Sequence, residues 1–157
     1  MIVKKPPTPC QLSADTTSVF LAGSIDMGTA VDWQAEMATR LADLDIVILN
    51  PRRDDWDSTW RQSIDEPQFR AQVEWELDGL ERASVIALWL APTTLAPISL
   101  LELGLTARSG RVIAGCPDGF WRKGNVEVVC ARCDIPLLSE FEAFVDAVRA
   151  RTIRCPG

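Results

Sequence analysis

A glutamate inside an almost wholly apolar run has the setting most suggestive of chemistry. Glu102 is flanked by Leu100, Leu101, Leu103 and Leu105. A carboxylate in such surroundings is seldom buried without a partner or a purpose, because taking its charge out of water costs free energy. The pattern leaves two interpretations open: Glu102 faces a ligand crevice as a catalytic group, or it caps a helix or joins a buried ion pair.

The 157-residue chain contains no histidine, and this narrows the chemistry available to it. Ser-His-Asp and Cys-His catalysis are excluded, so acid–base work falls to carboxylates, cysteine, lysine or water. The predicted helix Pro67–Arg82 carries three further acids, of which Glu74 and Asp78 share one face while Glu76 lies on another. Most acids on helices face solvent, so only one of the three needs to point inward.

The cysteines predict neither a metal site nor a disulfide framework. Their number is five, their spacing is scattered, and Cys130 and Cys133 form a single CxxC pair. A zinc site would need a second such pair or histidines. We therefore expect reduced structural thiols, with no metal and no other cofactor.

The elements that must position these residues alternate along the chain. Buried strands are predicted at Ser18–Gly23, Asp45–Asn50, Ser84–Leu90 and Arg111–Gly115. Helices are predicted at Ala30–Leu44, Pro67–Arg82, Ile98–Ser109 and Ser139–Arg151, the last with Ser139 and Glu142 as a capping box. Val126–Cys130 fits either a short fifth strand or the start of a helix. The alternation predicts an α/β fold, a doubly wound parallel sheet in a three-layer sandwich.

Parallel sheets of this kind bind ligands at the carboxyl ends of their strands, so the loops that follow the strands are candidate sites. Gly23 and Ser24 could offer backbone N–H groups to phosphate or ribose oxygens, although a plain turn fits equally well. After the second strand, Asn50 and Arg52 precede Trp56; arginine suits an anion and tryptophan suits stacking on a base. The alternative is a solvated loop whose tryptophans pack on the core.

The loop Cys116–Asn125 mixes basic, amide and aromatic side chains, which is a combination suited to a nucleotide. Arg122 and Asn125 are its candidate binding residues. The alternative is a surface loop whose Phe120 and Trp121 simply pack down.

Charge and hydropathy limit the partners. The net charge of −6 argues against a nucleic acid polymer, which calls for a basic surface, but not against a small nucleotide. No apolar run approaches the roughly 20 residues that span a bilayer, so no membrane association is expected. Prolines follow Lys4 and Lys5 where a signal peptide would have an apolar core. We expect a cytoplasmic protein with a flexible N-terminal arm over 1–15 and a single domain over 16–157.

Three segments resemble the nucleoside 2-deoxyribosyltransferase superfamily: Phe20–Ile25, Asp78–Ala83 and Ser99–Gly104. Asn50–Arg53 and Phe120–Asn125 are more similar to its divergent nucleoside 2-deoxyribosyltransferase-like branch. The resemblance covers about Val19 to Ile135. It implies a flavodoxin-like fold and cleavage or exchange of the N-glycosidic bond of nucleosides or nucleoside 5′-monophosphates.

The resemblance also implies roles for particular residues. Glu102 matches the family glutamate that attacks the anomeric carbon and forms a glycosyl-enzyme ester. Glu76 falls at or near the acid that handles the proton of the base. The Gly23–Ser24 turn matches the segment around the sugar, and Ser99 belongs to the motif that ends at the nucleophile. Asn125 matches an asparagine that transferases contribute across a subunit interface, which implies a homo-oligomer.

Two positions depart from the family pattern. Phe20 stands where many members have a tyrosine whose hydroxyl orients the nucleophile, and Ala96 stands where the transferases have an acid. These departures leave open the choice between transfer and hydrolysis. They also motivate an alternative, a non-catalytic nucleotide-binding or sensing module on the same fold. A third hypothesis is an assembly protein that uses its tryptophan-rich loops as an interface.

Overall fold

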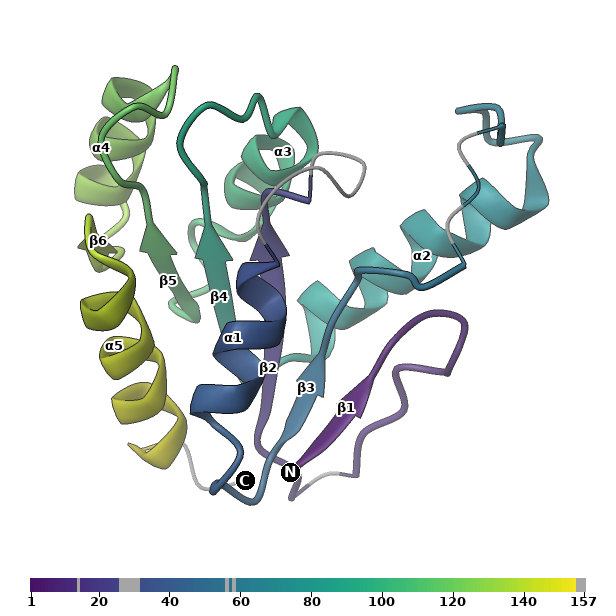
Figure 1. Ribbon diagram of the computed structural model, residues 1–157, viewed down its shortest axis with the longest axis horizontal. Helices are drawn as coiled ribbons and strands as arrows, with labels where there is room; N and C mark the ends of the chain where they lie inside the picture. The colour runs from purple at the N-terminus through teal and green to yellow at the C-terminus, as the bar shows by residue number, and fades with distance from the viewer. Residues whose placement is uncertain (14, 26–31, 56, 58, 155–157) are drawn as a thin grey trace.

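Six parallel strands form one sheet at the centre of the protein, a computed structural model that describes residues 1–13, 15–25, 32–55, 57 and 59–154 (Figure 1). The spatial order is β1-β3-β2-β4-β5-β6. The strands are β1 (Ile2–Lys4), β2 (Ser18–Gly23), β3 (Val47–Leu49), β4 (Val85–Trp89), β5 (Val112–Gly115) and β6 (Leu137–Leu138). The order reverses beside β2: the chain first adds β3 on one side of β2 and then adds β4 on the other side. Ligand crevices of doubly wound sheets form at such a point.

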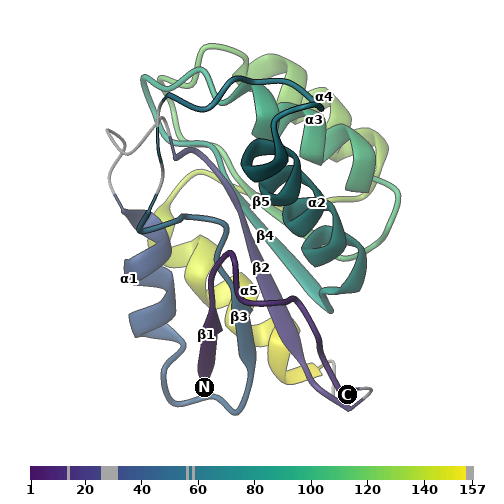
Figure 2. The same cartoon turned by 90° about the vertical axis from the view of Figure 1, so that its right-hand side faces the viewer.

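Helices cover both faces of this sheet and complete three layers (Figure 2). They are α1 (Trp33–Arg40), α2 (Pro67–Arg82), α3 (Pro97–Thr106), α4 (Lys123–Arg132) and α5 (Phe141–Arg154). Helices α1 and α5 pack on one face, in a core with Val19 and Leu21 of β2. Helices α2, α3 and α4 pack on the other, in a core with Phe20 and Ala22. The alternation of β2 side chains between the two cores confirms the predicted flavodoxin-like, doubly wound α/β fold.

The structure differs from the sequence prediction at the two edges of the sheet. Ile2–Lys4, expected within a flexible arm, form β1 and pair in parallel with β3. Leu137–Leu138 add β6 beside β5. Both edge strands are short and partly exposed. They therefore lack the continuous apolar run that marks a buried parallel strand.

For two helices, the structure decides an open alternative or shifts a predicted start. The ambiguous segment Val126–Cys130 is part of helix α4, which begins at Lys123. Helix α5 begins at Phe141, two residues beyond the predicted cap Ser139. Glu142 does not close a capping box there, because its carboxylate pairs with Arg40 of α1 at 2.7 Å.

A glycine brings α2 close against β2. A Cβ atom at Gly79 would lie 2.6 Å from two ring carbons of Phe20, closer than nonbonded carbons can approach. Because glycine has no side chain, the α2 backbone packs directly against that ring. This contact fixes how close α2 lies to the sheet and how the helix is rotated about its axis. It therefore also fixes the direction of Glu76, one turn earlier.

Candidate active site

Glu102 is buried on the sheet-facing side of α3. Its residue exposure is 7%, and Ser99, one turn earlier on the same helix, is also buried. No hydrogen bond or ion pair reaches the Glu102 carboxyl from the described part of the chain. Burial, and after it the nearby charge of Glu76, raise the pKa of Glu102 to about 8. Glu102 is therefore mainly protonated at neutral pH.

Glu76 lies on the neighbouring helix α2 and is half-buried. Burial raises its pKa, and a hydrogen bond from the Gln72 side chain acts against that rise. The charge of Glu76 is the second cause, after burial, of the raised pKa of Glu102. Two poorly solvated carboxyls that sense each other's charge can divide acid and nucleophile roles between them.

Phe20 lies in the core that underlies this pair. It is fully buried, its ring centroid is 6.1 Å from that of Trp75, and it shares the core with Leu103 of α3. No hydroxyl is available from this position to orient a carboxylate. The phenyl ring is instead part of the apolar core on this face of the sheet.

The turn after β2 is held by side-chain bonds to the loop after β4. Gly23 has φ of +138°, and a Cβ there would lie 2.1 Å from the Trp89 carbonyl oxygen. The Ser24 hydroxyl is 2.7 Å from that of Thr94 and accepts a hydrogen bond from the Ala91 N–H. Ser24 is 1% exposed, so its hydroxyl serves to join these two loops. Its predicted contact with substrate stays a prediction.

The loop after β3 begins with a turn built by Asn50. Its side-chain oxygen accepts a hydrogen bond from the Arg52 N–H at 3.0 Å. The Arg52 guanidinium lies 3.5 Å from Asp32, the residue that caps α1. Arg52 is thereby positioned where the carboxyl ends of β2 and β3 meet. Trp56, the predicted stacking residue, lies outside the described residues.

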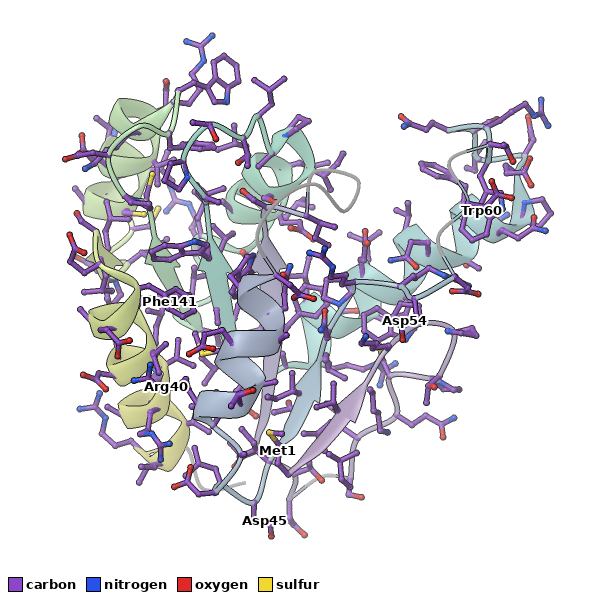
Figure 3. All side chains as sticks on the ribbon, viewed as in Figure 1. Met1, Arg40, Asp45, Asp54, Trp60 and Phe141 are labelled. Carbon is purple, nitrogen blue, oxygen red and sulfur yellow. The ribbon has the colours of Figure 1, made fainter. Side chains whose placement is uncertain are left out.

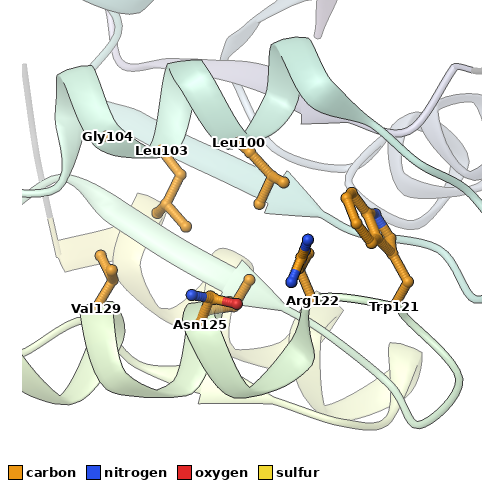
Figure 4. Close-up of a pocket in the computed structure, with 8 residues that line it drawn as sticks. Leu100, Leu103, Gly104, Trp121, Arg122, Asn125 and Val129 are labelled. Carbon is orange, nitrogen blue, oxygen red and sulfur yellow. The ribbon is translucent and has the colours of Figure 1, made fainter.

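Arg122 and Asn125 line a groove of about 360 Å³ between α3 and α4 (Figure 4). Its other lining residues are mostly apolar and include Leu100 and Gly104 of α3. Each of these two is two residues from Glu102, so each points about 200° away from it around the helix. Within one chain the structure thus places Arg122 and Asn125 across α3 from the carboxyl pair, and does not bring them together with it.

Sequence reasoning did not identify Gln72 as a functional residue. Its side chain is buried and donates to the Glu76 carboxylate at 2.7 Å. The spacing of Gln72 and Glu76 indicated that their side chains are neighbours, because residues four apart on a helix share a face. The spacing did not indicate that this face of α2 turns toward the core.

Two kinds of site find no candidate in the part of the chain that the structure describes. No group of three or more Cys, Asp or Glu side chains is arranged to hold a metal ion. None of the described helices is long and apolar enough to cross a membrane.

Comparisons with known proteins agree with this architecture. A search of curated proteins finds no match. Among solved structures, a conserved protein from Enterococcus faecalis V583 superposes with a TM-score of 0.61, covering 87% of this chain and 99% of that chain at 13% identity. Identity that low shows a shared fold and nothing more. The family model described as nucleoside 2-deoxyribosyltransferase like matches residues 16–120, more than half of the chain. The protein therefore belongs to the nucleoside 2-deoxyribosyltransferase-like family.

Proposed function

We propose that this protein cleaves or exchanges the N-glycosidic bond of a nucleoside or a nucleoside 5′-monophosphate. The observation that carries the proposal is the pair formed by Glu102 and Glu76, two poorly solvated carboxyls coupled by charge. In the proposed reaction, protonated Glu102 and Glu76 together supply one proton and one carboxylate, which acid-assisted displacement needs. Family membership supports a nucleoside-type small molecule as the ligand.

The reaction uses both carboxyls in turn. Once substrate is bound, the proton held by Glu102 passes to Glu76, and the Glu102 carboxylate attacks the anomeric carbon. As the new C–O bond forms, the bond to the base breaks and Glu76 gives its proton to the base nitrogen. Water, or a second base in an exchange reaction, then attacks the glycosyl ester while Glu76 takes up the released proton. The cycle ends with Glu102 released and the pair again sharing one proton.

The other predicted site residues are proposed to bind the sugar and the phosphate. We place the sugar beside the Gly23–Ser24 turn and Ser99, with the buried Phe20 ring in the core beneath it. Asn50 and Arg52 line the edge of the sheet at β3, where a guanidinium suits a 5′-phosphate.

The direct test is a panel of ribo- and deoxyribonucleosides and their 5′-monophosphates, each with and without an acceptor base. Product analysis by chromatography is expected to show free base or an exchanged nucleoside with at least one of them. Glu102→Gln is expected to reduce kcat by at least about a thousandfold, because the nucleophile is lost. Glu81→Gln, on an exposed position of α2, is the matched control and is expected to retain full activity. Full activity in Glu102→Gln would refute the proposal.

The second candidate function is a non-catalytic nucleotide-binding module, and the apolar environment of Phe20 favours it. No hydroxyl from β2 orients Glu102, which is otherwise without a hydrogen bond from the described residues. Calorimetry that shows tight nucleotide binding beside zero turnover would support this function. Turnover that disappears in Glu102→Gln would exclude it.

We also propose that the chain acts as a homo-oligomer through the outer surface of α3 and α4. Large apolar side chains are exposed there, with Leu101 58%, Leu105 62% and Val128 70% exposed. Exposed apolar clusters of this kind mark association sites. Such an interface would bring Asn125 of one copy toward another copy. Light scattering after size exclusion is expected to report a dimer or larger assembly, which Leu105→Asp dissociates; a monomeric wild type would refute the proposal.

A further inference from the structure

The Gln72 side chain is a buried amide whose hydrogen-bonding groups all have partners. Its Nε2 donates to the Pro51 carbonyl at 3.0 Å and to Glu76 Oε1 at 2.7 Å. Its Oε1 accepts a longer bond from Arg53 Nη1 at 3.5 Å. The residue is 5% exposed, so water does not compete for these bonds.

These partners allow only one orientation of the amide. A backbone carbonyl can only accept and a guanidinium can only donate, so Nε2 must face Pro51 while Oε1 faces Arg53. With Nε2 so directed, an N–H group always points at Glu76. Rotating the amide by half a turn would set oxygen against oxygen at both Pro51 and Glu76.

Arg53 is itself held in place by the segment between β3 and α2. Its guanidinium makes two bonds of 2.8 Å to Asp55 and stacks over the Trp60 ring, 5.0 Å from the centroid. Figure 3 shows Trp60 and Asp54 along this segment, which continues into α2. The loop that follows the strand edge is therefore linked through Gln72 to a carboxyl of the candidate pair.

We propose that Gln72 is a positioning residue for the reaction proposed above: its locked amide occupies Oε1 of Glu76 and leaves Oε2 as the oxygen that exchanges protons. The inference rests on that proposed function. An N–H donated to Oε1 favours the ionised form of Glu76 and so opposes the rise in its pKa that burial causes. The charged groups in this network are Glu76 of α2, Glu102 of α3, and Arg53 with Asp55 from the loop. After substrate binds, the proton has a single acceptor atom, Oε2, from which it reaches the leaving base.

The test replaces Gln72 by methionine, which keeps the length and flexibility of the side chain but removes the amide. Gln68→Met is the matched control, because Gln68 lies one turn earlier on α2 and is exposed. Titration of ¹³C-labelled glutamate carboxyls by NMR, assigned with Glu76→Gln and Glu102→Gln, is expected to show the Glu76 midpoint moving to higher pH in Gln72→Met only. The kcat of Gln72→Met is expected to fall about tenfold or more with KM nearly unchanged, because a misdirected acid affects the chemical step.

The wild-type protein supplies a second readout that does not depend on the variant folding. The Gln72 side-chain amide resonances are expected to shift in step with the Glu76 titration. Amide resonances that ignore that titration, or a folded Gln72→Met with an unchanged Glu76 midpoint, would overturn the inference. Absence of turnover with every substrate would refute the proposed function, while the titrations would still decide whether Gln72 orients Glu76.

Discussion

Replacing Glu102 by glutamine is expected to abolish a loss of stability that the wild type undergoes as pH rises. The pKa of Glu102 is raised from 4.5 to about 8 in the folded protein by burial and by Glu76. A carboxyl with a folded-state pKa above its unfolded value favours folding while it is protonated. That contribution is complete below about pH 4.5 and is lost as pH rises to about 8. Glutamine stays neutral throughout this range, so its contribution does not change.

The size of the effect follows from the same values. Each pH unit between the unfolded and folded pKa is worth about 1.4 kcal/mol, so ionising Glu102 in its site costs up to about 5 kcal/mol. Typical domains have a total stability of about 5–15 kcal/mol, so this cost is a large fraction of the whole. Relative to wild type, Glu102→Gln is expected to gain several kcal/mol on going from pH 5.5 to pH 8.5.

Urea unfolding followed by tryptophan fluorescence at these two pH values measures the difference. Comparing the variant with wild type at each pH removes the contribution of all other titrating groups to the free energy of unfolding. Glu81→Gln, at an exposed acid on α2, controls for the loss of a negative charge. If the stability difference between Glu102→Gln and wild type were the same at both pH values, Glu102 would not be a carboxyl that burial keeps protonated. Glu102 would then not supply the proton that the proposed reaction requires.

Three further perturbations test the site and its support. For the pH dependence of kcat/KM, we expect a fall above about pH 8, because the pair then loses the proton held by Glu102; a plateau through pH 9 would contradict the shared proton. Ala96 has φ of 42° at the start of α3, so Ala96→Gly is expected to raise the free energy of unfolding by up to about 1 kcal/mol in urea melts. Gly79→Ala is expected to lower it by about 1–2 kcal/mol, since overpacking against Phe20 outweighs the gain in helix propensity. Gly104→Ala, in open space on α3, is the matched control and is expected to be neutral or stabilising by up to about 1 kcal/mol.

The fold followed from sequence wherever hydrophobic periodicity was strong. Helix α2 has the predicted bounds Pro67–Arg82, and β2 has the predicted bounds Ser18–Gly23. Strand β1 was missed because an exposed edge strand of three residues carries no such signal. Helix α4 was ambiguous for a related reason: only Val126 and Cys130 of its residues are buried, which is too few to show a helical period.

The sequence indicated which residues could form the candidate site, but not which residues contact one another. An acid inside an apolar run indicated Glu102, although Leu101 and Leu105 of the same run are exposed and only the rotation of α3 decides which residues are buried. The partner of each polar group could not be inferred in the same way. The Gly23–Ser24 turn was expected to offer backbone N–H groups to a ligand, but nothing in the sequence indicated that the Ser24 hydroxyl bonds Thr94, seventy residues away. The role of Gln72 could be inferred only from the structure, because the packing of Gly79 against Phe20 fixes the rotation of α2.

In the proposed reaction, the burial that opposes ionisation of Glu102 would also strengthen its carboxylate as a catalytic group. Removing water from around the pair costs up to about 5 kcal/mol for the free carboxylate, and binding of the substrate must offset this cost. In the same poorly solvated site, a carboxylate attracts developing positive charge on the sugar more strongly than it would in water. Glycosidic cleavage passes through such a charge, whereas the bound substrate lacks it, so the attraction is largest at the transition state. An apolar ring at Phe20 is compatible with this proposed chemistry, because Glu76 is oriented by the Gln72 amide and the ring adds to the apolar core.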